Sequence, residues 1–507
     1  MPDAPRQHPT LAQVLVPAVG LVALLLLVAV VASPGSFLVR VAPVVDDAGA
    51  PATPDAPAPP VGLPAPPRDD PVPQQAERAG SDAVTSAFED LLELRDEAVA
   101  TGDADDWTST TAEEVLGRES FTALSGLPLT RFESSLVPGT LLAGDVGDVG
   151  DAGAWSARVE TVFELAGGPV VERTDTVTLA PVTSEPVTSA PVTSAPVTSA
   201  RVTLAPTVSG GVSPGADSTW QVRSWTPYPE QGELGTAAPW DLGPVHASVT
   251  ERAVVLSWVA PEGTPADAAT WGAQVGGWAD AGAVTVDSYL GTAWPRVSLL
   301  LVPATVEQFV ALVPGPRPAV DDVYAAVTTD VDTPDDGGGD LVVLNPTARS
   351  ELVAETWQVT VTHELVHVAS GARFGDEQEA WLAEGFADLV GWSALVPATV
   401  EREVVAARLL ERVATGAVDA SALPAAQQFG DPDPDVVGDA YEGSWLAALL
   451  LEDELGTEGL ISLYTAASQG TDDARGRVDA ALLAATGQGR DAFEARWGAF
   501  VVDLATS

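Results

Sequence analysis

The chain of 507 residues contains no cysteine and no lysine, only one methionine and only four histidines. Without cysteine, disulfide bonds, thiol nucleophiles and cysteine-ligated metal clusters are excluded. The 23 cationic side chains are all arginine, and 72 acidic side chains outnumber them, which gives a formal net charge of −49. Such a charge repels nucleic-acid phosphates, so we expect no nucleic-acid partner. The sequence also lacks a P-loop and a dinucleotide-binding fingerprint.

Two of the four histidines belong to one motif: His363, Glu364 and His367 form the pattern HExxH. Residues four apart share one face of a helix, so both imidazoles can bind the same metal ion. The largely apolar segment 357–370, followed by Gly371, favours a helix here. The motif predicts a Zn²⁺ site with Glu364 as the general base. The alternative is a core helix with two hydrogen-bonded histidines.

A catalytic zinc site needs a third protein ligand and keeps one position open. Glu384 lies seventeen residues after His367, in the segment WLAEGFAD. A turn and a second helix packed beside the first would bring this carboxylate to the metal. Asp388 lies one helical turn later, on the same face, where it can accept the free N–H of a ligating histidine. For Glu384, a surface carboxylate in a very acidic chain is the alternative.

The motifs HExxH and WLxEGxAD together resemble the gluzincin metallopeptidases, and more narrowly the peptidase MA-like proteins of high-GC actinobacteria. The resemblance is specific over about residues 340–395 and weaker over about 235–500. It implies a zincin fold, a Zn²⁺ cofactor and peptide or protein substrates. In the family pattern two histidines and a later glutamate bind zinc, the glutamate of HExxH is the base, and an acid one turn later supports a ligand. The corresponding residues are His363, His367, Glu384, Glu364 and Asp388.

The expected reaction is hydrolysis of a peptide bond by a zinc-activated water. Glu364 would take the proton of this water and later pass it to the leaving amine, with no covalent intermediate. The oxyanion needs a further donor, and Tyr441, at an expected helix start, is the candidate. A packing role for Tyr441 stays open, and Tyr324 and Tyr464 are weaker candidates. A Gly-x-Met-x-Asn exopeptidase signature is missing, which favours an endopeptidase.

An uncharged apolar stretch, residues 11–39, predicts a transmembrane helix. Residues 1–10 would form a cytoplasmic tail, and the remaining chain would lie outside the cell as a single-pass protein of the cell membrane. The alternative is a signal peptide that is cleaved near residues 30–32, which would give a secreted protein.

The rest of the sequence predicts an α+β protein in four parts. Residues 41–80, rich in proline and alanine, form a linker. Residues 81–232 predict a small α+β domain like the nuclear-transport-factor fold, interrupted by a low-complexity insert at 180–206. Residues 238–395 predict a zincin-like catalytic domain, and residues 396–507 a helical C-terminal subdomain.

Within these parts the hydrophobic pattern predicts individual elements. A helix is expected over 83–100, with strands at 157–165, 220–225, 253–257, 297–303, 325–329 and 341–344. One of the last two strands would lie at the edge of the sheet and pair with an extended substrate. Helices are expected at 400–415, 445–454, 460–467, 477–485 and 490–504.

These expectations combine into a membrane-anchored, extracytoplasmic zinc metallopeptidase. A catalytically inactive zincin-fold binding module at the cell surface is the alternative. The linker and the repeat alone would support a third reading, a cell-wall stalk or adhesin.

Overall fold

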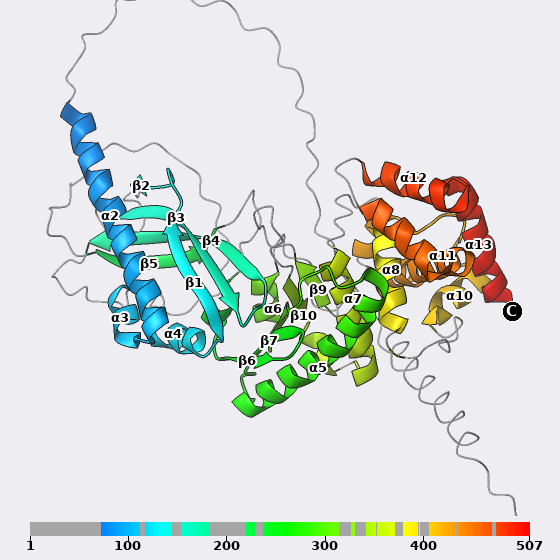
Figure 1. The fold of residues 1–507 in the computed structure, drawn as a ribbon, viewed down its shortest axis with the longest axis horizontal. Helices are drawn as coiled ribbons and strands as arrows, with labels where there is room; N and C mark the ends of the chain where they lie inside the picture. Colours follow the sequence, from blue (N-terminus) through cyan, green and yellow to red (C-terminus); the bar gives the residue numbers. More distant parts are fainter. Residues whose placement is uncertain are drawn as a thin grey trace, which may run out of the picture.

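A computed structural model describes the fold of most of the chain from residue 72 onward. The described residues are 72–111, 117–143, 154–181, 220–228, 237–313, 326–329, 341–350, 352–370, 379–393, 395, 405–431, 433–468 and 473–507. Figure 1 shows three parts in a row: an N-terminal sheet with its helices, a central sheet, and a group of C-terminal helices.

The predicted α+β class is confirmed, but the predicted fold class is wrong in including an N-terminal transmembrane helix. None of the helices in the described ranges is sufficiently long and apolar to cross a membrane. The first of them, α2 (Val72–Thr101), carries acidic residues along its length. The stretch 11–39, on which the transmembrane helix was placed, lies outside the described residues, as do the tail 1–10 and most of the insert 180–206.

The N-terminal part consists of helices packed on an antiparallel sheet. After α2 come α3 (Ala104–Ser109) and α4 (Arg118–Ser125), then β1 (Leu129–Leu136), β2 (Leu142–Ala143), β3 (Trp155–Leu165), β4 (Val170–Pro181) and β5 (Trp220–Pro227). The strand order is β1-β3-β4-β5, and β2 pairs with β3. Val84, Phe88 and Leu92 form the buried face of α2 and pack on the sheet. The helix and strands predicted here are confirmed, although α2 begins inside the predicted linker.

The central part is a mixed five-stranded sheet of order β6-β7-β8-β10-β9. Its strands are β6 (Val245–Val249), β7 (Ala253–Trp258), β8 (Ser298–Val302), β9 (Ala326–Thr329) and β10 (Leu341–Leu344). β7, β8 and β10 are parallel, and β6 and β9 run antiparallel at the two edges. Every residue of β7 and β8 is buried, as expected for strands covered on both faces.

Helices cover this sheet and continue into the C-terminal part. α5 (Pro265–Leu290) packs on β6, β7 and α7 (Ala354–Ser370), and α6 (Val306–Leu312) precedes β9. The remaining helices are α8 (Ala380–Ser393), α10 (Ala407–Ala414), α11 (Pro434–Ser468), α12 (Ala474–Thr486) and α13 (Arg490–Thr506). The two helices predicted at 445–454 and 460–467 are the halves of α11, which meet at Gly456 with φ 73°.

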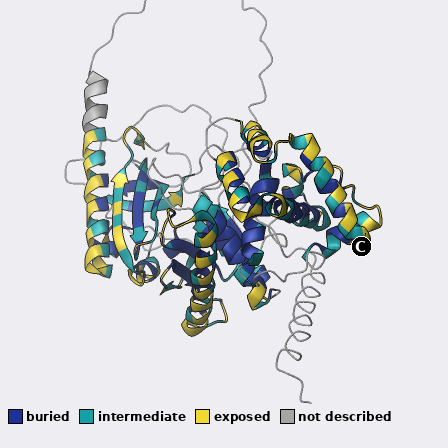
Figure 2. Ribbon diagram, turned by 45° about the vertical axis from the view of Figure 1, so that its right-hand side comes forward, coloured by how far each residue is buried: buried dark blue, intermediate teal, exposed yellow. Residues whose placement is uncertain are grey.

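One hydrophobic core joins the N-terminal sheet to the rest. Trp240, in the short helix η1 (Pro239–Leu242), packs edge-on against Phe132 and Phe163, with ring centroids 5.7 and 5.1 Å apart. The same core continues through the central sheet to α8 and α11, and Figure 2 shows many of the buried residues, in dark blue, there. The small α+β part is therefore packed against the predicted catalytic part.

Candidate metal centre

The HExxH motif lies on α7, a helix that is buried on almost every side. Its neighbours come close because they place glycine against it. A Cβ on Gly282 of α5 would lie 2.7 Å from Thr362 Oγ1, and a Cβ on Gly391 of α8 would lie 3.0 Å from the Val359 carbonyl oxygen. The first distance excludes a side chain and the second is tighter than an ordinary contact, so these glycines allow α5 and α8 to lie close to the motif.

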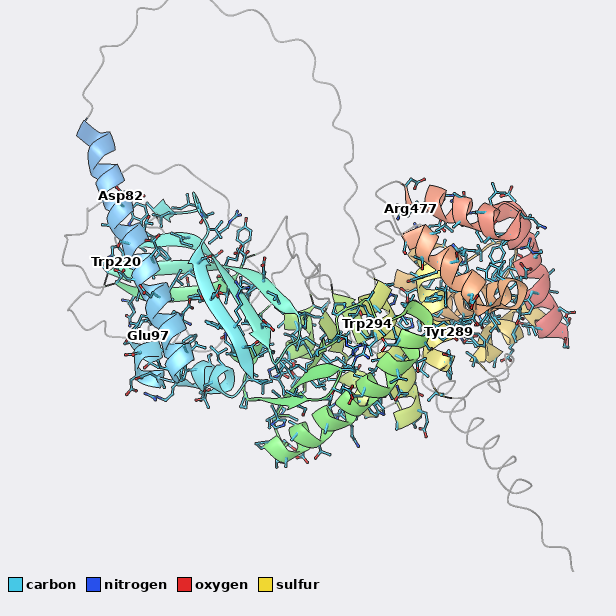
Figure 3. All side chains as sticks on the ribbon, in the orientation of Figure 1. Asp82, Glu97, Trp220, Tyr289, Trp294 and Arg477 are labelled. Carbon is cyan, nitrogen blue, oxygen red and sulfur yellow. The ribbon has the colours of Figure 1, made fainter. Side chains whose placement is uncertain are left out.

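Glu384 and Asp388 lie on α8, the helix that packs beside α7. Gly385 follows Glu384 directly, and a Cβ at that position would collide with the Ser444 carbonyl of α11. Tyr289, near the end of α5 and labelled in Figure 3, packs edge-on against Phe386 with ring centroids 6.2 Å apart. α8 is thus held from both sides, which fixes its carboxylates relative to the histidines of α7.

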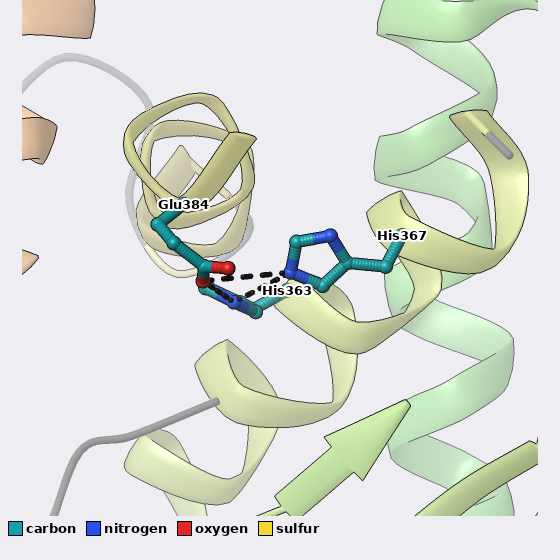
Figure 4. Close-up of side chains that lie close together, drawn as sticks. All are labelled: His363, His367 and Glu384. Carbon is teal, nitrogen blue, oxygen red and sulfur yellow. Dashed lines mark hydrogen bonds and ion pairs between the residues drawn. The ribbon is translucent and has the colours of Figure 1, made fainter. Parts of the chain in front are cut away.

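Three side chains converge on one point between these two helices. His363 Nε2 lies 3.0 Å from His367 Nε2 and 3.1 Å from Glu384 Oε2, and His367 Nε2 lies 3.6 Å from the same oxygen (Figure 4). Ligands about 2.0–2.1 Å from a tetrahedral zinc ion would be about 3.3 Å apart, which matches this spacing. His363, His367 and Glu384 could therefore hold a metal ion.

Asp388 supports this group through His363. Its Oδ1 lies 2.7 Å from His363 Nδ1, so the Nδ1–H donates to the carboxylate and Nε2 faces the point of convergence. His363 is 3% exposed and Glu384 only 1%. Water therefore contributes little to the stabilisation of charge in this group.

The electrostatics of the group favour a cation. Burial acts to lower the pKa of His363, but the carboxylates of Asp388 and Glu384 outweigh burial and raise this pKa well above 6.5. Burial acts to raise the pKa of Glu384, yet the two histidines lower it to about 2. The imidazoles and the carboxylates thus stabilise the charged forms of one another. The imidazoles are surrounded by an excess of buried negative charge.

Glu364 lies next to the three converging side chains and is fully buried. Its Oε2 accepts a hydrogen bond of 2.6 Å from the Thr328 hydroxyl of β9. Its Oε1 has no hydrogen-bond partner within the described part of the chain. Burial raises the pKa of Glu364, although the two histidines and Thr328 act in the opposite direction. A carboxylate whose pKa is raised in this way holds a proton more readily, as a general base requires.

Tyr441 also lies close to the group. It lies seven residues after the first residue of α11, and not at the helix start as predicted; its ring centroid lies 6.4 Å from that of His363. It packs edge-on against Phe429 at 5.0 Å. Tyr464 instead stacks on Phe386 and donates to Ser370, which indicates a packing role, and Tyr324 lies outside the described residues.

Thr328 is a polar neighbour of Glu364 that the sequence did not single out. Its strand was predicted, but nothing in the sequence shows that its hydroxyl would reach a helix 36 residues later.

The sequence was also compared with known proteins. It matches no protein-family model. No curated protein is similar enough to count as a match. The resemblance to gluzincins thus depends on the two motifs, and the metal site on the geometry described above.

Proposed function

We propose that this protein is a zinc-dependent peptidase in which Glu364 is the general base. One observation carries the proposal: single donor atoms of His363, His367 and Glu384 lie 3.0–3.6 Å from one another, beside a buried carboxylate with one oxygen that has no partner among the described residues. A structural zinc site would fill all four positions with protein ligands, whereas this group offers three.

The choice of zinc follows from the donor set. Two imidazole nitrogens and one carboxylate oxygen, without sulfur, suit Zn²⁺ better than the harder Mg²⁺ and Ca²⁺, which prefer oxygen ligands. The carboxylate of Asp388 on His363 is the kind of supporting contact that fixes a ligating histidine. These residues therefore fit the metal that the HExxH pattern requires.

A zinc ion bound here would act as a Lewis acid toward a carbonyl and a water molecule. Glu364 would accept the proton of the attacking water on Oε1 and then donate it to the leaving amine. β9 is the terminal strand of the central sheet among the described residues, and its Thr328 contacts Glu364. An extended peptide paired with that edge would lie beside the base. Tyr441 is the candidate donor to the oxyanion.

The second candidate function is a zinc-binding surface module without activity. A binding module needs the same metal ligands as the enzyme, so only the role of Glu364 distinguishes the two candidate functions. A binding module has no need for a buried carboxylate whose pKa is raised, and burying one costs stability. The position of Glu364 therefore favours the enzyme.

The test uses the purified full chain, the Glu364→Gln variant and a Thr360→Val control. Thr360 lies one turn earlier on the same helix and its hydroxyl is buried, so the control makes an equally conservative change away from the ligands. Zinc content is measured by mass spectrometry and cleavage with a peptide library. We expect about one zinc per chain in all three proteins and cleavage by all except Glu364→Gln. A zinc content near zero refutes the proposal, and zinc without cleavage favours the binding module.

A further inference from the structure

Thr328 connects the edge strand of the central sheet to the side chain of Glu364. Its Oγ1 lies 2.6 Å from Glu364 Oε2 and 3.5 Å from the Glu364 carbonyl oxygen. β9 is antiparallel to β10, with Thr328 opposite Val342. The contact therefore joins α7 to a strand that is paired with β10 and also packs against α7.

The two carboxylate oxygens of Glu364 have different surroundings. Oε2 is bound by Thr328, and Oε1 is buried without a hydrogen-bond partner among the described residues. Because a carboxylate is planar, fixing one oxygen also fixes the direction of the other. An ionised carboxylate accepts a short charge-assisted hydrogen bond of this length strongly.

We propose that Thr328 is a positioning residue: its hydroxyl holds Glu364 Oε2 so that Oε1 is directed to the proton that Glu364 must accept. This inference rests on the proposed function, because it assigns Thr328 a role only if Glu364 acts as a base. A purely structural hydrogen bond would satisfy a buried carboxylate without regard to which oxygen is left open.

β9 also contacts the proposed base and would pair with the substrate. The edge of β9 is where an extended peptide would add to the sheet, and the same strand carries the hydroxyl that orients Glu364. A displacement of β9 therefore changes the position of both the scissile bond and the base. Preorganisation of this kind lowers the barrier without strengthening ground-state binding.

The experiment is a double-mutant cycle on the full chain loaded with Co²⁺, whose visible absorption reports on binding of acetohydroxamate. A hydroxamate loses its hydroxyl proton when it chelates a metal, so a correctly placed base strengthens its binding. The variants are Thr328→Val, Thr328→Ser, Glu364→Gln and the double variant Thr328→Val/Glu364→Gln. Thr360→Val is the matched control, and metal affinity is measured for each protein. Where wild type cleaves a library peptide, kcat and KM are measured as well.

We expect Thr328→Val to weaken acetohydroxamate binding about 10-fold while metal affinity stays within about 2-fold, as for loss of a supporting contact. Thr328→Ser restores binding, and Thr328→Val has no further effect once Glu364 is Gln. On a cleaved peptide, Thr328→Val lowers kcat and leaves KM unchanged.

Three results overturn the inference. They are an equal effect of Thr328→Val with and without the Glu364 carboxylate, failure of Thr328→Ser to restore binding, and a loss confined to metal affinity. If wild type binds no metal, the proposed function fails together with this inference. If wild type binds metal and hydroxamate but shows no coupling between Thr328 and Glu364, only the role of Thr328 fails.

Discussion

Replacement of Glu384 by Gln tests the metal centre without relying on any substrate. The side chain is 1% exposed and supplies the only carboxylate oxygen among the three converging donors, so water has little access to replace it. Losing one partner of a buried charged pair costs on the order of 4 kcal/mol. We therefore expect the zinc affinity to fall about a thousand-fold.

The expected effect on thermal stability follows from the linkage between zinc binding and folding. At free zinc 100-fold above its dissociation constant, the wild-type protein gains about 2.7 kcal/mol, which corresponds to about 5–10 °C in Tm for a domain of this size. At the same zinc concentration the variant would be at about one tenth of its own dissociation constant, and its gain is less than about 0.1 kcal/mol. Differential scanning calorimetry with zinc and with a chelator measures the zinc-dependent rise in Tm of the wild type and of the variant.

The matched control is Glu458→Gln, the same change at an exposed position on α11. It should keep the full zinc-dependent rise in Tm. Equal zinc stabilisation of Glu384→Gln and wild type would show that the third ligand is elsewhere. No zinc stabilisation of the wild type would remove the metal site altogether.

Three further predictions concern individual charged side chains. Asp388→Asn should lower zinc affinity or activity about 10–100-fold, because it weakens the contact that orients His363; a change below 2-fold in both assays would contradict this role. Arg490→Leu should destabilise folding by about 3–5 kcal/mol in urea unfolding, since it leaves the fully buried Glu379 without its cation at 2.8 Å, and a loss below 1 kcal/mol would refute it. Burial raises the pKa of Glu442 to about 7 from its ordinary 4.5, so the folded state binds this proton more tightly and stability falls as pH rises from about 4.5 to 7. Glu442→Gln should remove up to roughly 3 kcal/mol of that pH dependence, and equal slopes for both proteins would show that Glu442 does not cause it.

The sequence predicted the candidate site well because the site is built mainly from local spacing. The four-residue separation of His363 and His367 places both on one face of α7, and the same rule places Asp388 one turn after Glu384. Only the meeting of Glu384 with the histidines required a tertiary assumption, and the distances of 3.1 and 3.6 Å agree with it.

The elements that the sequence missed lack such a local signal. α5 was not predicted because seven of its 26 residues are alanine, which gives little amphipathic contrast, and four are glycine, which lowers helix propensity. Gly272, Gly276 and Gly282 are nonetheless required, since a Cβ at each would lie within 2.9 Å of a neighbouring side chain. In this helix, glycine serves close packing against the sheet and α7 rather than helix formation.

Close helix packing also explains how α8 holds Glu384 near the two histidines of α7. Gly391 sets the approach of α8 to α7, Gly385 sets its approach to α11, and Glu379 ties the start of α8 to Arg490 at the start of α13. Glu384, the proposed third ligand, is thus positioned by the C-terminal helices, although the HExxH motif itself belongs to the central part. A substitution outside the proposed ligands, such as at Arg490, should therefore weaken zinc binding as well as folding. The two effects separate by comparing the dissociation constant of zinc, measured on the folded fraction, with the free energy of unfolding without metal. If Arg490→Leu lowers stability but leaves the zinc dissociation constant unchanged, the C-terminal helices stabilise the fold without determining the geometry of the site.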